Sequence, residues 1–480
     1  MLRTLLCTLL CGLATLPAAA QSLPQPGDSL YKAMKERVFI IEGSTPATYD
    51  YRFSKSDAAS IIDRLPHVHE HPSIDAALTD RVRDSLRAVM LGRIASFPSD
   101  TLLTCDIFRV LRPHFDFLYD IDPHYRISIR CSSPLPARKS VRKSRHLPFT
   151  CMNIGDTLLV DTSLDGRFRT GDRILAIDDI TADSMLLYCY PDRYCYTSAL
   201  LRHCRYASQR NRFRVLLQRD GRTVEVETGG LPLRTNSVRL AQAVETDRSI
   251  RIFEDAGCGY ISVPRFYAVN SRLVRIVHKA VRDFHSQGLS NVIIDMRRNP
   301  GGNGGDLDRF ISIFTDRDTV AVSHGERVRV SRRTLNDYAF LTEEMLGQNA
   351  ELPQGEFVAG FPTDPSMYVG GMKYYVMIGP DTGSVAALVA NILHYNGAAT
   401  LVGEPLRRNA FRFGECLDGH TLWPTCLCEM AISTNESDCC TLAEDGILRP
   451  DIEIPCIAAE YMTGRDAQLE RLLRLIRENQ

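Results

Sequence analysis

The sequence lacks an excess of charge of either sign. Its 480 residues include 57 lysines and arginines against 58 aspartates and glutamates. Proteins that hold nucleic acids or anionic membranes through their overall charge need such an excess. The composition therefore gives no electrostatic reason to expect either partner. With 44% hydrophobic and 24% charged residues, the chain has the composition of a globular protein, and its length suits two or three domains.

Long apolar runs are also lacking beyond the N-terminus, so we expect no membrane-spanning segment there. At the N-terminus, Leu5 to Leu16 is apolar but too short to cross a bilayer. Ala18-Ala19-Ala20 precedes Gln21 in the manner of a signal-peptidase site. We therefore expect residues 1–20 to be a cleaved signal peptide and the mature chain to be periplasmic or secreted. An uncleaved anchor and a lipoprotein modified at Cys11 are the alternatives.

Zinc-binding motifs are lacking, although cysteine is plentiful. Cys426-Leu-Cys428 and the pair Cys439-Cys440 do not have the Cys-x-x-Cys spacing of zinc sites, so zinc is disfavoured. Of the 15 cysteines, Cys7 and Cys11 belong to the N-terminal segment, and the odd number of 13 remains. At least one cysteine is then unpaired within the monomer. We expect buried free thiols together with one or two disulfides.

The segment from His67 to His71, HVHEH, places three histidines around one glutamate. Metal binding is one interpretation of this pattern. Because no further set of ligands accompanies the three histidines, we predict instead a solvated turn before Pro72. Neither a metal ion nor any other cofactor is predicted for the chain.

A glycine-rich stretch stands out between Ser290 and Leu307, SNVIIDMRRNPGGNGGDL. The apolar run from Val292 to Ile294 predicts a buried strand, and four glycines follow it closely. Such density after a strand indicates special backbone angles or a close approach of another group. Because no Gly-Lys-Ser/Thr follows, a phosphate loop is disfavoured. A flexible surface loop and a loop whose N–H groups face a developing negative charge remain as alternatives.

A serine lies at a predicted strand-to-helix turn further along the chain. Tyr374 to Ile378 predicts a strand, Ser384 to Leu393 a helix with one apolar face, and Ala399 to Val402 the next strand. The N–H groups of a first helical turn have no partner within the helix, and the helix dipole favours negative charge there. Ser384 is therefore a candidate nucleophile, with a simple helix N-cap as the alternative.

In this order and at this spacing, the two stretches resemble the tail-specific, or carboxy-terminal processing, family of serine peptidases. The family has a strand that ends in Asp-x-Arg-x-Asn-x-Gly-Gly. The matching residues here are Asp295, Arg297, Asn299, Gly301 and Gly302. Its nucleophile turn is followed by a helix and a strand ending in Gly-Glu-Pro, so that Gly403-Glu404-Pro405 aligns Ser384 with the nucleophile. The resemblance implies an α/β core of the ClpP/crotonase-like type.

The resemblance covers most of the mature chain. Gly171 to Ile177, GDRILAI, resembles an element of PDZ domains, which bind peptides by adding a strand to a sheet edge. Asp220-Gly221 predicts a tight hairpin in the same unit. The predicted fold class is multidomain α/β. Its parts are a signal peptide (1–20), a mainly helical N-terminal region (22–146), a PDZ-like β-rich domain (147–232), the α/β peptidase core (240–460) and a C-terminal helix (461–480).

The resemblance also raises a question about the catalytic base. Bacterial tail-specific members use a lysine shortly after Gly-Glu-Pro, and Asn409 occupies that position here. Asparagine cannot accept the proton. A branch resembling the tricorn protease core uses a histidine and a glutamate instead. Its matches in this chain are His124, in the element Asp122-Pro-His124, and Glu444, before the closing strand.

The sequence therefore predicts an exported serine endopeptidase that acts on proteins or peptides with a base other than lysine. Ser384 is the predicted nucleophile, His124 the base and Glu444 its partner. The N–H groups of Val385 and of Gly301 or Gly302 are predicted to hold the oxyanion. The alternative is a catalytically inactive protein that binds peptides or other ligands on the same scaffold. The oligomeric state is left open.

Export has a direct test. Mass-spectrometric mapping of the exported protein should place its first residue near Gln21, because the small residues before it suit signal peptidase. An exported chain that retains Met1 would contradict a cleaved signal peptide.

Overall fold

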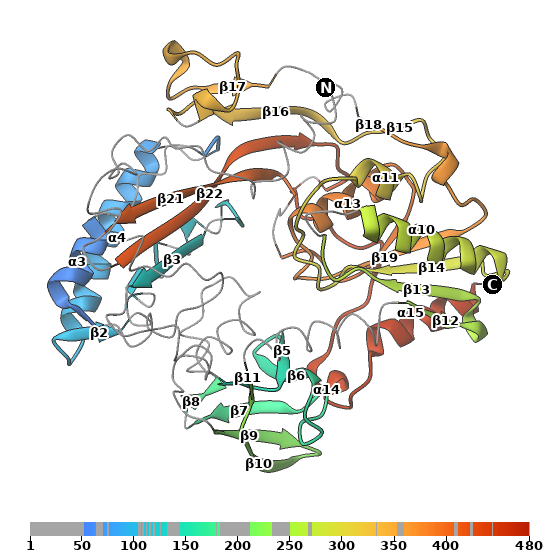
Figure 1. The fold of residues 1–480 in the computed structure, drawn as a ribbon, viewed down its shortest axis with the longest axis horizontal. Helices are drawn as coiled ribbons and strands as arrows, with labels where there is room; N and C mark the ends of the chain where they lie inside the picture. The colour runs from blue at the N-terminus through green and yellow to red at the C-terminus, as the bar shows by residue number, and fades with distance from the viewer. Residues whose placement is uncertain are drawn as a thin grey trace.

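The computed structural model describes residues 52–63, 71–73, 76–103, isolated positions between 107 and 118, 121–124, 126–131, 145–178, 180–182, 212–232, 250–266, 271–332, 334–352, 360–407, 411–422, 426–443 and 445–479. Within these residues the architecture is α/β with several sheets, as the sequence predicts (Figure 1). None of the described helices is long and apolar enough to cross a lipid bilayer. The predicted signal peptide, residues 1–20, lies outside the described part.

A six-stranded, mostly parallel sheet forms the core. Its strand order is β12 (Ile250–Phe253), β13 (Cys258–Ser262), β14 (Asn291–Asp295), β19 (Lys373–Ile378), β20 (Thr400–Gly403) and β23 (Ile452–Glu453). Only β12 runs antiparallel to its neighbour. The apolar run predicted around Val292 to Ile294 is β14, a strand near the middle of the sheet whose two faces are both covered. Such burial explains why the run is continuously apolar rather than alternating.

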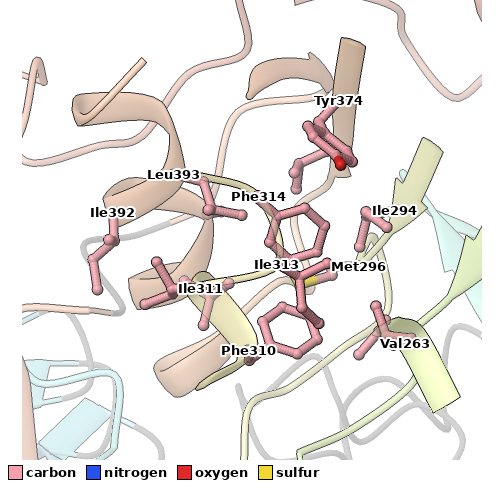
Figure 2. Close-up of a cluster of buried hydrophobic side chains, with 14 of the residues drawn as sticks. Val263, Ile294, Met296, Phe310, Ile311, Ile313, Phe314, Tyr374, Ile392 and Leu393 are labelled. Carbon is pink, nitrogen blue, oxygen red and sulfur yellow. The ribbon is translucent and has the colours of Figure 1, made fainter. Parts of the chain in front are cut away.

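Helices cover both faces of this sheet. On one face, α10 (Ser271–Ser286), α11 (Leu307–Ile311) and α13 (Ser384–Tyr395) pack over Ile294 and share its hydrophobic cluster. Figure 2 shows Phe310 and Phe314 of this layer between α13 and the strands. On the other face lies α15 (Ala467–Glu478), which falls within the segment 461–480 predicted as the C-terminal helix.

A partly buried arginine fastens α15 to the end of β14. The Arg297 guanidinium donates to both carboxylate oxygens of Asp295 and to both of Asp466, with N–O separations of 2.6 to 3.2 Å. Asp466 is the N-cap of α15 and accepts the N–H of Leu469 at 3.1 Å. Burial raises the pKa of Asp295, but the charge and hydrogen bonds of Arg297 outweigh burial and hold that pKa below its usual range.

A second sheet is built around a long hairpin that the sequence analysis does not predict. The hairpin consists of β21 (Phe413–Leu422) and β22 (Cys426–Cys439). One half of β22 pairs with β3 (Arg126–Cys131), and the other half pairs with β16 (Ser323–Arg329). On its other edge β16 pairs with β17 (Asn349–Glu351). The chain around residue 126 thus joins a sheet formed mainly by residues more than 190 positions later.

The segment 145–232 contains a separate six-stranded sheet. Its strand order is β10 (Arg222–Thr228), β9 (Phe213–Arg219), β7 (Arg173–Ile177), β6 (Thr157–Ser163) and β5 (Phe149–Ile154), with β8 (Ile180–Thr181) beside β7. The predicted hairpin at Asp220-Gly221 is confirmed: both residues have positive φ, 49° and 74°, between β9 and β10. The first and last strands of the segment, β4 (Arg145–His146) and β11 (Leu231–Pro232), pair with each other in a two-stranded sheet.

This sheet contacts the core beside the glycine-rich loop. Asp161 of β6 lies 2.7 Å from the guanidinium of Arg298 and accepts the hydroxyl of Tyr461 at 2.8 Å. A side chain at Gly171 would meet the carbonyl oxygen of Tyr461 at 2.6 Å. Gly171 therefore permits close packing between the sheet and α14 (Ala458–Tyr461).

The N-terminal region packs two helices on a small sheet. The helices α3 (Lys55–Asp63) and α4 (Ala76–Ser96) bury one hydrophobic cluster with β1 (Arg52–Ser54) and β2 (Thr101–Leu103). The prediction of a solvated turn before Pro72 is wrong for His71, which is fully buried with 0% of its surface exposed. The reason is its position against the second sheet, where its ring packs 4.8 Å from Phe413.

Candidate active site

Ser384 is the first residue of α13, directly after the turn that leaves β19. The N-cap is Gly383, so Ser384 does not cap the helix and the N-cap interpretation is wrong. Ser384 is half-buried and has φ 47°, in the left-handed region. For a residue other than glycine this conformation is strained, and such strain gathers at functional sites. A serine on a sharp strand-to-helix turn presents its hydroxyl away from the backbone, as a nucleophile requires.

Asn299 ties the glycine-rich loop to the serine turn. Its backbone carbonyl accepts the N–H of Gly383 at 2.9 Å, and its side-chain oxygen accepts the N–H of Gly301 at 2.9 Å. Its side-chain nitrogen donates to the carbonyl of Val263 at 2.9 Å. Asn299 is fully buried, so all three bonds are shielded from water.

Gly301 lies so close to Ser384 that a residue with a side chain would not fit in its place. A Cβ atom at Gly301 would lie 2.6 Å from the Cβ of Ser384 and 2.9 Å from the nitrogen of Val385. The φ of Gly301 is also positive, 98°. Only glycine combines this conformation with this contact at no steric cost. The predicted glycine loop and the predicted serine turn are therefore in direct contact.

The two candidate glycines differ in the use of their N–H groups. The N–H of Gly301 is already bonded to Asn299. Among the described hydrogen bonds, none engages the N–H of Gly302 or that of Val385. Gly302 is held by a bridge to Phe266, whose amide donates to the carbonyl of Gly301 at 3.0 Å.

His124 lies beside β3, next to the second sheet. Its backbone N–H donates to Asp122 at 2.9 Å, and its ring Nδ1 lies 3.5 Å from the same carboxylate. In the part of the chain that the structure describes, the contacts of His124 and the contacts of Ser384 have no residue in common. Glu444 and Asn409 lie outside the described residues, so their predicted roles stay predictions.

The sequence analysis gave no role to Asp122, Ser433 or His71. Asp122 was visible as the first residue of the Asp-x-His element, but its burial and its bonds to Ser433 depend on the hairpin.

Five described cysteines are free thiols. They are Cys151, Cys258, Cys439, Cys440 and Cys456. Burial raises the pKa of Cys258 to about 12, which makes this thiol unreactive at neutral pH.

A serine at a strained helix start, held against a glycine loop on a parallel sheet, is the arrangement of a serine-type peptidase. Comparisons with known proteins agree with this class. Residues 257–411 match the model of peptidase family S41. The core of the chain, from β13 to the segment after β20, is therefore similar to peptidase family S41. No curated protein matches the chain.

Solved structures share the fold over most of the chain. Mature CPAF has 14% identical residues and a TM-score of 0.57, covering 88% of this chain and 98% of its own. Mature CPAF complexed with lactacystin has 15% identity and a TM-score of 0.59, covering 89% of this chain and 99% of its own. At this identity the likeness shows a shared fold and says nothing about individual residues.

The contact between Gly301 and Ser384 gives the first mutational prediction. Gly301→Ala should slow covalent labelling of the serine by an activated phosphonate on the order of 100-fold, because the new methyl group displaces the nucleophile and its neighbouring N–H. Labelling rates followed by mass spectrometry measure this effect.

Gly397→Ala is the matched control. Gly397 follows the same helix with φ 70°, yet a Cβ there meets nothing within 4 Å. The control should lose about 1 to 2 kcal/mol of stability through backbone strain alone and keep its labelling rate. Equal labelling rates in both variants would contradict a steric role for Gly301.

Proposed function

We propose that this chain is an exported endopeptidase of the S41 type that hydrolyses proteins or peptides with Ser384 as nucleophile and His124 as base. The observation that carries the proposal is the strained serine at the start of α13 in contact with the Asn299–Gly302 loop. A turn that only joined a strand to a helix would have no need of this strain. Glu444 is the proposed partner of the base.

The oxyanion site in this proposal is formed by the N–H groups of Val385 and Gly302. Val385 belongs to the first turn of α13, where the helix dipole favours a developing negative charge. The N–H of Gly302 is free for this task because, in the described bonds, Asn299 takes the N–H of Gly301 instead. The sequence had left Gly301 and Gly302 as alternatives, and this bond favours Gly302.

The reaction then follows the ordinary course of acyl transfer. The oxygen of Ser384 bonds to the scissile carbonyl carbon while His124 accepts the hydroxyl proton. The two N–H groups hold the oxyanion of the tetrahedral intermediate. His124 returns the proton to the leaving amine, and water then hydrolyses the acyl-enzyme.

A non-catalytic ligand-binding protein is the second candidate, and Asn409 at the position of the family lysine is the observation that favours it. A fluorophosphonate probe separates the two functions, because only an activated hydroxyl reacts with it. We expect the probe on Ser384, no labelling of Ser384→Ala and nearly none of His124→Ala. A folded protein whose Ser384 stays unlabelled would contradict the peptidase function, and full activity of His124→Ala would exclude this base.

We further propose that the unit from 147 to 232 is PDZ-like and docks substrate peptides next to the active site. Asp161 of this unit contacts Arg298, which directly precedes Asn299 in the chain, so we expect a peptide held on this unit to lie close to the oxyanion loop. Removal of the unit should therefore raise KM more than it lowers kcat.

The pairing of β4 with β11 makes this removal practicable. His146 lies opposite Leu231, so a short glycine linker can join the chain on either side of the unit. Kinetics on a peptide substrate measure the effect, with circular dichroism as the check on folding. An unchanged KM in the shortened, folded protein would rule out the docking role.

A further inference from the structure

A buried carboxylate lies beside the proposed base and has no part in the function described so far. Asp122 is fully buried. It accepts the N–H of Ser433 at 2.7 Å, the hydroxyl of Ser433 at 3.0 Å and the N–H of His124 at 2.9 Å. Burial raises the pKa of Asp122, but its interactions with His124 and Ser433 outweigh burial, so the pKa lies below its usual range and the group is ionised.

A second histidine faces the same carboxylate from the other side. His71 is fully buried, and burial lowers its pKa to about 4, so the imidazole is neutral at physiological pH. Its Nδ1 accepts the N–H of Ser73 at 3.1 Å. The proton of the neutral ring is therefore on Nε2, which lies 3.9 Å from the second oxygen of Asp122. At this distance the contact is electrostatic rather than a formed hydrogen bond.

His71 is fixed in this position by its neighbours. The guanidinium of Arg329 donates to the carbonyls of His71 and Pro72, and the side chain of Asn349 donates to Pro72 at 2.9 Å. The hydroxyl of Ser73 donates to Glu436 of β22. The segment 71–73 is thus bound to β16, β17 and β22, and its histidine is directed at Asp122.

The ring of His124 completes the group. Its Nδ1 is buried and has no hydrogen-bond partner among the described residues, and it lies 3.5 Å from Asp122. A buried ring nitrogen without a partner is costly, whereas a small movement brings this one to hydrogen-bond distance of a charged acceptor. Catalytic hydrogen bonds are commonly long before substrate is bound.

We propose that Asp122, rather than Glu444, is the carboxylate that orients His124, and that His71 orients Asp122. Both are positioning residues: Asp122 holds the proton of His124 on Nδ1, which leaves Nε2 free to accept the proton of Ser384. His71 faces the other oxygen of Asp122 and so fixes the orientation of the carboxylate that holds His124. The proposal rests on the proposed function, in which His124 is the base.

The decisive experiment compares Asp122→Asn with Glu444→Gln in the full-length chain. Nuclear magnetic resonance of protein labelled with ¹⁵N-histidine follows the Nδ1–H signal of His124, which is assigned by its absence from His124→Gln. We expect this signal to survive in Glu444→Gln and to vanish in Asp122→Asn. The rate of Ser384 labelling should fall about 10³- to 10⁴-fold in Asp122→Asn and less than about tenfold in Glu444→Gln.

The two readouts keep the two hypotheses apart. Loss of the signal in Glu444→Gln and its survival in Asp122→Asn overturn the assignment of Asp122, whatever the labelling shows. A wild-type protein that keeps the signal but is not labelled at Ser384 overturns the proposed function instead.

Variants of His71 test its part even if Asp122→Asn does not fold. His71→Asn keeps an acceptor for the N–H of Ser73 but removes the donor that faces Asp122. His71→Gln places an amide nitrogen close to the former Nε2 position. We expect His71→Asn to slow labelling about tenfold and to weaken the Nδ1–H signal, while His71→Gln stays near wild type. Equal behaviour of two equally stable variants overturns the role of His71.

Discussion

The contact between the Asn299–Gly302 loop and the Ser384 turn is the constraint on which the candidate site depends. Two hydrogen bonds of Asn299 fasten the loop to the serine turn and to Val263 beyond β13, and a third, to Gly301, lies within the loop. The absence of a side chain at Gly301 lets the two backbones meet. Because Asn299 is fully buried, no water competes for these bonds. The strained conformation of Ser384 is thus maintained by the surrounding structure rather than by its own preference.

The strand order of the core places these two turns together. β14 and β19 are parallel neighbours, so their carboxyl ends lie at the same edge of the sheet, and one turn leaves from each end. Open α/β sheets bind their ligands at this edge. Arg297 lies two residues after the end of β14. Through its bonds to Asp466 it fastens α15, on the opposite face of the sheet, to the start of the glycine-rich loop.

The sequence predicted the core elements because their signals are local. Patterns within about 20 residues indicate the continuous apolar run of β14, the apolar face of α13 and the helical character of α15. The hairpin of β21 and β22 was missed because its pairing with β3 joins residues far apart in the chain. The burial of His71 was missed for the same reason, since its environment comes from the distant residues Phe413 and Asp122. The choice between Gly301 and Gly302 depends on one side-chain bond, which no spacing reveals.

The missed hairpin is also the element that relates the nucleophile to the base. In its middle, Ser433 of β22 holds Asp122 and thereby the Asp-x-His element. At its end, the carbonyl of Cys440 accepts a 2.8 Å hydrogen bond from Asn391, a fully buried residue of the helix that begins at Ser384. Figure 1 shows the hairpin extending from β3 toward the core helices. A single strand thus connects the two halves of the proposed catalytic group. We therefore expect a change in how β22 pairs to alter the position of His124 relative to Ser384 without any substitution of either residue.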